Sequence, residues 1–108
     1  MKSNPHIDSD GTKYWHNKKG QLHRTDGPAI IYKSGTKTWW QNGERHRIDG
    51  PAEIYNDGYK AWYQNGECHR TDGPAEIYKN GTKHWFINDK PIKPIPDHII
   101  LWSKKLDA

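Results

Sequence analysis

Three copies of a histidine followed three residues later by an aspartate are the first residues of this sequence that could do chemistry. An imidazole beside a carboxylate can act as a general base, and a row of imidazoles can bind zinc. Catalysis needs one nucleophile in one pocket, whereas these pairs recur unchanged. We therefore interpret them as structural corners and predict no catalytic residue, no metal ion and no cofactor. The pairs are His23 with Asp26, His46 with Asp49, and His69 with Asp72.

A second pattern places a lysine two residues before a tryptophan, four times along the chain. Single-strand nucleic-acid binders use such residues, because ammonium groups bind phosphates while bases stack on aromatic rings. The competing interpretation is that these tryptophans form the core. The members of this Lys–Trp face are Lys13, Trp15, Lys37, Trp39, Lys60, Trp62, Lys83 and Trp85.

The composition favours the core interpretation. The chain has 108 residues, enough for one domain over residues 1–108. Only 31% of the residues are hydrophobic, but six are Trp and six are Tyr, so we expect a folded chain with a core of Trp, Tyr and Ile. The formal net charge of +4 permits an anionic partner without requiring one.

The same sequence indicates a cytoplasmic protein. No apolar run approaches the roughly 20 residues of a membrane span, so we predict no such span. The first residues lack the apolar segment of a signal peptide. Cys68 is the single cysteine, which excludes a disulfide within the chain and fits a reducing compartment.

The elements that must position these residues come from a repeat of 23 residues. The segment His-Arg-x-Asp-Gly-Pro-Ala occurs at residues 23–29, 46–52 and 69–75. Self-similarity at a fixed period is the signature of repeat architectures. The repeats that we assign are residues 11–34, 35–57 and 58–80, followed by a partial repeat at 81–90.

Each repeat carries the signals of antiparallel hairpins. In the second repeat, period-two alternation predicts strands at 36–41, 44–47 and 52–55. Asn42-Gly43 predicts a two-residue type I′ turn, and Asp57-Gly58 carries the same kind of signal. The predicted fold class is all-β, with repeated antiparallel hairpins in an extended twisted sheet or solenoid. Residues 91–108 predict a Pro-rich connector and a short C-terminal capping helix, through which a homodimer is an open alternative.

The unit that runs from Trp39 through Asn42-Gly43 to His46 resembles the MORN repeat. The resemblance covers about residues 11–90 and is closer to a variant with His-Arg-x-Asp-Gly-Pro-Ala in small bacterial and phage proteins. A usual MORN unit has glycine directly after the histidine, where this chain has arginine. The resemblance implies an extended β-sheet used as a scaffold or binding module, and it implies no catalytic residue.

Together these features predict a non-enzymatic protein-binding module, whose partner is another protein. Tyr, Trp and Arg are the side chains that most often anchor interfaces. The resemblance implies an inhibitor or adaptor of a larger host complex. The alternative is a binder of single-stranded nucleic acid, a nucleotide or a lipid head group through the Lys–Trp face. The residues expected at a protein interface are Tyr32, Arg45, Arg47, Tyr55, Tyr59, Arg70 and Tyr78.

Overall fold

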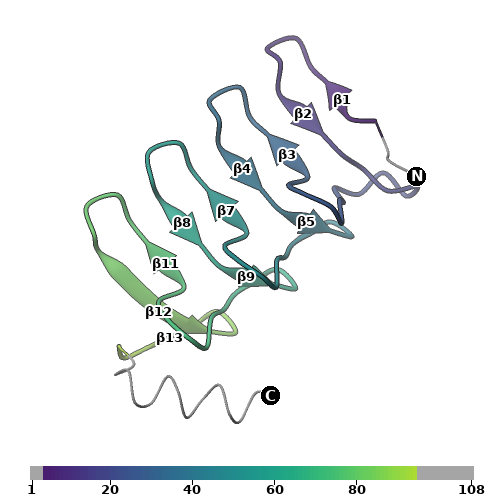
Figure 1. Ribbon diagram of the computed structural model, residues 1–108. Coiled ribbons are helices and arrows are strands. Elements are labelled where there is room, and N and C mark those ends of the chain that lie inside the picture. Colours follow the sequence, from purple (N-terminus) through teal and green to yellow (C-terminus); the bar gives the residue numbers. More distant parts are fainter. Residues whose placement is uncertain (1–3, 95–108) are drawn as a thin grey trace.

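The computed structural model describes residues 4–94, which form thirteen short β-strands joined by turns (Figure 1). Nine strands form one continuous antiparallel sheet, the main sheet, which begins with β1 and ends with β13. This arrangement confirms the all-β prediction and shows an open sheet with two edges. In order across the main sheet, the strands are β1 (His6–Ile7), β2 (Lys13–Tyr14), β3 (Ile30–Ile31), β4 (Lys37–Thr38), β7 (Glu53–Ile54), β8 (Lys60–Ala61), β11 (Glu76–Ile77), β12 (Lys83–Ile87) and β13 (Lys90–Ile92).

The other four strands form two small hairpins beside the main sheet, and we call them the hairpin row (Figure 1). Adjacent hairpins of this row are hydrogen-bonded through their backbones. The amide of Arg47, just after the first hairpin, donates to the carbonyl of Tyr63 at 3.0 Å, and the amide of Gly66 donates to the carbonyl of Arg45 at 2.9 Å. Each repeat therefore bonds to its neighbours in two places, as in solenoid proteins. The strands of the row are β5 (Trp40–Gln41), β6 (Glu44–Arg45), β9 (Tyr63–Gln64) and β10 (Glu67–Cys68).

The repeated tryptophan is the point at which the chain passes from the main sheet to the hairpin row. The sequence predicts one strand over residues 36–41, but the structure divides it at Trp39 into β4 and β5. The amide of Trp39 donates to the carbonyl of Ala52 at 2.7 Å, and its carbonyl accepts from the amide of His46 at 3.0 Å. Because both backbone groups bond outside the two ladders, the strand bends there and changes partners.

Two kinds of turn close the hairpins. Asn42 and Gly43 have φ values of 51° and 82°, which confirms the type I′ turn, since this turn needs positive φ at both central residues. The turn at Asp57-Gly58 is different, because the amide of Tyr55 donates to the carbonyl of Tyr59 at 2.9 Å across a loop of three residues. Only Gly58 of this loop has a positive φ, 102°, as in a hairpin with a bulge.

The most deeply buried side chains are smaller than the composition indicated. Ala29, Ala52, Ala61 and Ala75 have no exposed surface, while Trp15 is 7% exposed and the other described tryptophans are half-buried. The expectation of a core made of Trp, Tyr and Ile is thus wrong in part. The carbonyl of the alanine after each Asp-Gly-Pro accepts from the amide of the repeated tryptophan, where the chain passes from the main sheet to the hairpin row. A larger side chain at this packed position would displace its neighbours.

The predicted C-terminal helix lies outside the described residues. The same holds for most of the predicted connector and for the homodimer contact that we associated with that helix. Within residues 4–94 every element is a strand or a turn.

Candidate functional site

Each Asp-Gly-Pro corner is clamped by its arginine. In the second corner, Cζ of Arg47 lies 4.0 Å from the ring centroid of Trp39. Nε of Arg47 donates to Oδ1 of Asp49 at 3.0 Å, and Nη1 donates to the carbonyl of Pro51 at 3.0 Å. A guanidinium can stack on a ring and donate in its own plane at once. The equivalent stacked pairs are Arg24 on Trp15 at 3.8 Å and Arg70 on Trp62 at 4.0 Å.

Each corner histidine bonds to the turn of the next repeat. The Nδ1 atom of His46 accepts a hydrogen bond from the amide of Asn65 at 2.9 Å. His23 and His69 accept equivalent bonds from the amides of Asn42 and Asn88, at 3.0 and 3.1 Å. The three imidazoles therefore serve three separate turns. No group of three His, Cys, Asp or Glu that could hold a metal ion occurs among residues 4–94.

The Lys–Trp face is divided by the bend at each tryptophan. The four lysines are exposed, and on one face of the main sheet they alternate across the strands with isoleucines such as Ile54. The rings of Trp39 and Trp62 instead line two cavities between successive corners, of about 450 and 400 Å³. The charged residues that line these two cavities are arginines and aspartates of the corners, together with a histidine in each.

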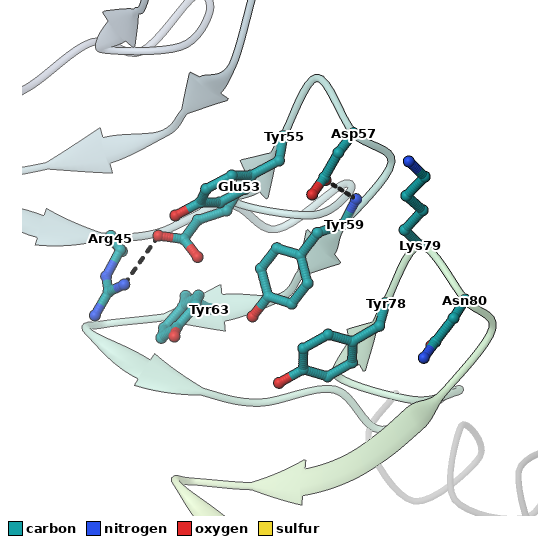
Figure 2. A pocket seen from close by; sticks show the side chains of 9 residues that line it. All are labelled: Arg45, Glu53, Tyr55, Asp57, Tyr59, Tyr63, Tyr78, Lys79 and Asn80. Carbon is teal, nitrogen blue, oxygen red and sulfur yellow. Dashed lines mark hydrogen bonds and ion pairs between the residues drawn. The ribbon is translucent and has the colours of Figure 1, made fainter.

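A larger cavity than these two lies on the face of the main sheet opposite the lysines, a groove of about 790 Å³ that we call the tyrosine groove. Figure 2 shows tyrosine rings from two repeats along its length, with Arg45 at one end and Asn80 at the other. This volume is in the range of ligand-binding pockets. The residues lining the groove are Arg45, Glu53, Tyr55, Asp57, Tyr59, Tyr63, Tyr78, Lys79 and Asn80.

The register of the main sheet shows which side chains share the face of the groove. Glu53 pairs with Ala61, which pairs on its other side with Glu76. Cross-strand partners point to the same face, so a small alanine separates two glutamates. Two residues further toward the turns, the rings of Tyr55 and Tyr59 lie 5.1 Å apart.

The ring of Tyr59 also lies 4.9 Å from that of Tyr78, which extends the row into the next repeat. Three tyrosines thus stand in a row along the groove. Ala61 itself is fully buried.

Two strong polar contacts hold side chains of the groove in place. Nη1 of Arg45 donates to Oε2 of Glu53 at 2.9 Å, and its Cζ lies 4.2 Å from the ring centroid of Tyr63. Although burial opposes its charge, the hydrogen bond that Arg45 donates to Glu53 raises the pKa of Arg45. The Tyr59 hydroxyl donates to Oε2 of Glu76 at 2.7 Å. Burial and this bond raise the pKa of Tyr59, and burial raises the pKa of Tyr63 to about 12.

The structure brings together four of the seven residues expected at a protein interface. Arg45, Tyr55, Tyr59 and Tyr78 all line the tyrosine groove. Tyr32 occupies the same repeat position as Tyr55 and Tyr78 and is similarly exposed, at 38% against 39% and 37%, but it does not line the groove.

The other two arginines of the expected interface lie elsewhere. Arg47 and Arg70 are stacked on tryptophans in the corners. Their guanidinium groups therefore already have aromatic, carboxylate and carbonyl partners within their own repeats.

The sequence did not single out three residues of this site. Glu53, Tyr63 and Glu76 share the face of the groove or bond directly to its walls. The sequence does contain one relevant spacing: Glu53 follows Arg45 by eight residues, and the equivalent residue of the next repeat, Glu76, follows Cys68 by eight residues. Without the register, that spacing does not show that the side chains meet.

Comparisons with protein families, with curated proteins and with solved structures find no match. No helix long and apolar enough to span a membrane is found in the part of the chain that the structure describes. Cys68 is a free thiol there, and its burial raises its pKa to about 12, so the thiolate nucleophile is disfavoured at neutral pH.

Proposed function

We propose that this protein is a protein-binding repeat module that takes a segment of its partner into the tyrosine groove. The observation that supports this proposal is the convergence of Arg45, Tyr55, Tyr59 and Tyr78 from two repeats on one groove of about 790 Å³. Tyrosine supplies a large contact area at a low cost in conformational entropy. The resemblance to small bacterial and phage repeat proteins implies an inhibitor or adaptor of a larger host complex as the form of this role.

The aromatic walls are already ordered by contacts within the chain. The Tyr55, Tyr59 and Tyr78 rings contact one another, and the Tyr59 hydroxyl is held by Glu76. A preorganised wall loses little side-chain freedom on binding, so more of the contact energy appears as affinity. The rims carry Asp57 and Lys79, which suit a polar border around an apolar centre.

Affinity capture with matched variants tests this proposal. The wild-type chain, the double variant Tyr55→Ser and Tyr78→Ser, and the control Tyr32→Ser are each used to capture proteins from a lysate of the source cells, with and without nuclease treatment. Tyr32 is the matched control, because its repeat position and exposure are the same but it lies outside the groove. We expect a protein that the wild type and the control retain and the double variant loses.

Two results would overturn the proposal. One is a set of retained proteins that does not differ between the wild type and the double variant. The other is retention that disappears with nuclease treatment alone, which would instead favour binding of nucleic acid through the Lys–Trp face.

A further inference from the structure

The three repeats use equivalent positions of the tyrosine-groove face in three different ways. The pair formed by residue 45 and residue 53 in the second repeat corresponds to residues 22 and 30 in the first and to residues 68 and 76 in the third. In the first repeat both positions are apolar, Leu22 and Ile30. In the second repeat they are Arg45 and Glu53, which form an ion pair at 2.9 Å.

The third repeat keeps the carboxylate and lacks the arginine. Glu76 occupies the position of Glu53, but Cys68 occupies the position of Arg45. The Oε1 atom of Glu76 lies 3.2 Å from Nδ1 of His84 and 3.5 Å from the Tyr78 hydroxyl, so its internal partner is a histidine, which is a cation only when protonated, in place of an arginine. The side chain of Glu76 is 16% exposed, compared with 9% for Glu53. A largely buried carboxylate is stabilised by a cation with which it can pair.

Arg45 shows how this fold accommodates a cation. Its guanidinium lies over the Tyr63 ring at 4.2 Å and meets Glu53 at the same time. The aromatic partners beside Glu76 are Tyr59 and Tyr78. The formal charges lining the groove cancel, since Arg45 and Lys79 balance Glu53 and Asp57. Glu76 lies beside the groove, bonded to Tyr59 of its wall, and with His84 neutral it adds one negative charge to this balance.

We propose that the tyrosine groove binds an arginine or lysine side chain of the partner protein, with the cation beside Tyr59 and Tyr78 and paired with Glu76. This inference rests on the proposed function, because it names the part of the partner that enters the groove. Cation–π contact and a charged hydrogen bond act together at such a site.

The test uses two defined peptides and NMR spectroscopy of the ¹⁵N-labelled protein. The probes are acetyl-Gly-Ser-Arg-Ser-Gly-amide and the same peptide with citrulline, which has the shape of arginine without its charge. We expect the arginine peptide to shift the amide signals of residues 59 and 76–78, with an affinity about tenfold higher than that of the citrulline peptide, since a hydrogen bond to a charged group is lost. Equal affinity of the two peptides, or shifts elsewhere only, would overturn the inference.

Two variants assign the effect to Glu76. Glu76→Gln should remove the preference for arginine, whereas the control Glu67→Gln, at an exposed carboxylate of β10, should keep it. Cys68→Arg should supply an internal cation like Arg45 and should lower the affinity for the arginine peptide. Retention of the preference in Glu76→Gln would refute the site even if Cys68→Arg does not fold.

This outcome is separable from that of the proposed function. If the tyrosine variants lose the captured protein but the two peptides bind equally, the groove binds protein without a cation, and only this inference fails. If the peptides are distinguished but the tyrosine variants keep the captured protein, the proposed function fails instead.

Discussion

Replacement of Arg47 by alanine should destabilise the protein more than its surface ion pair alone would indicate. The Arg47 side chain is 24% exposed, and its guanidinium stacks on Trp39 at 4.0 Å. A partly desolvated cation–π contact contributes about 1–2 kcal/mol. The charged hydrogen bond to the Pro51 carbonyl at 3.0 Å adds about 1.5 kcal/mol. The bond to Asp49, whose side chain is 86% exposed, adds well under about 1 kcal/mol.

The expected loss for Arg47→Ala is therefore about 3 kcal/mol of the free energy of unfolding. Small domains have only about 5–15 kcal/mol in total, so the Tm should fall by roughly 10–20 °C. Arg47→Lys keeps the charge but loses the planar stacking, and it should lose about half as much.

Urea unfolding monitored by tryptophan fluorescence, together with thermal circular dichroism, measures these losses. Asp49→Ala is the control, with an expected loss below about 1 kcal/mol. The reasoning would be refuted if Arg47→Ala cost less than about 1 kcal/mol, or if Asp49→Ala cost as much as Arg47→Ala.

Three further predictions follow from the same contacts. A Cβ added at Gly50 would lie 2.9 Å from Cζ of Arg47, so Gly50→Ala should displace that guanidinium. In a double-mutant cycle with Arg47→Ala, the losses in the free energy of unfolding should therefore be strongly non-additive. Additive losses would contradict this. His46→Ala should cost about 1 kcal/mol in urea unfolding, because the amide of Asn65 loses its acceptor; an unchanged midpoint would show that water replaces the imidazole. Burial raises the pKa of Cys68 from 9.0 to about 12, so the unfolded state loses this thiol proton at a lower pH than the folded state does. The contribution of Cys68 to the free energy of unfolding should therefore be constant below about pH 9 and should fall between about pH 9 and 12, by up to about 1.4 kcal/mol per pH unit. The slope of Tm against pH should be smaller in Cys68→Ala, and an equal slope would be contrary to the assignment.

The repeat and its turns could be predicted because their causes are local. Asn42-Gly43 has the two residues that tolerate positive φ, so the turn type follows from the dipeptide. The extra residue of the first repeat also has a local cause. The loop between Asn17 and Gln21 has three residues and closes with a hydrogen bond of 2.9 Å between their backbones, where the second repeat uses two residues.

The break at Trp39 and the small core could not be predicted by the same reasoning. Alternation of side chains describes which face a residue takes, but it does not show which strand the backbone bonds. The amide of Trp39 bonds to Ala52, thirteen residues away, and its carbonyl to His46. The burial of the alanines depends on the strands that pair on both sides of them, as Ala52 does with Trp39 and with Ala61 of the next repeat, so it is a property of several repeats together.

The sequence by itself determined the period, the hairpins and the candidate residues, since these depend on residue types and short spacings. Only the tertiary structure decided which of those residues meet. Arg45 and Arg47 are two residues apart, yet Arg45 lies in the tyrosine groove with Glu53, while Arg47 is stacked on Trp39 in a corner. The physical reason is strand register: cross-strand pairing puts Glu53, Ala61 and Glu76 in one row on one face of the main sheet, and Arg45 meets Glu53 there.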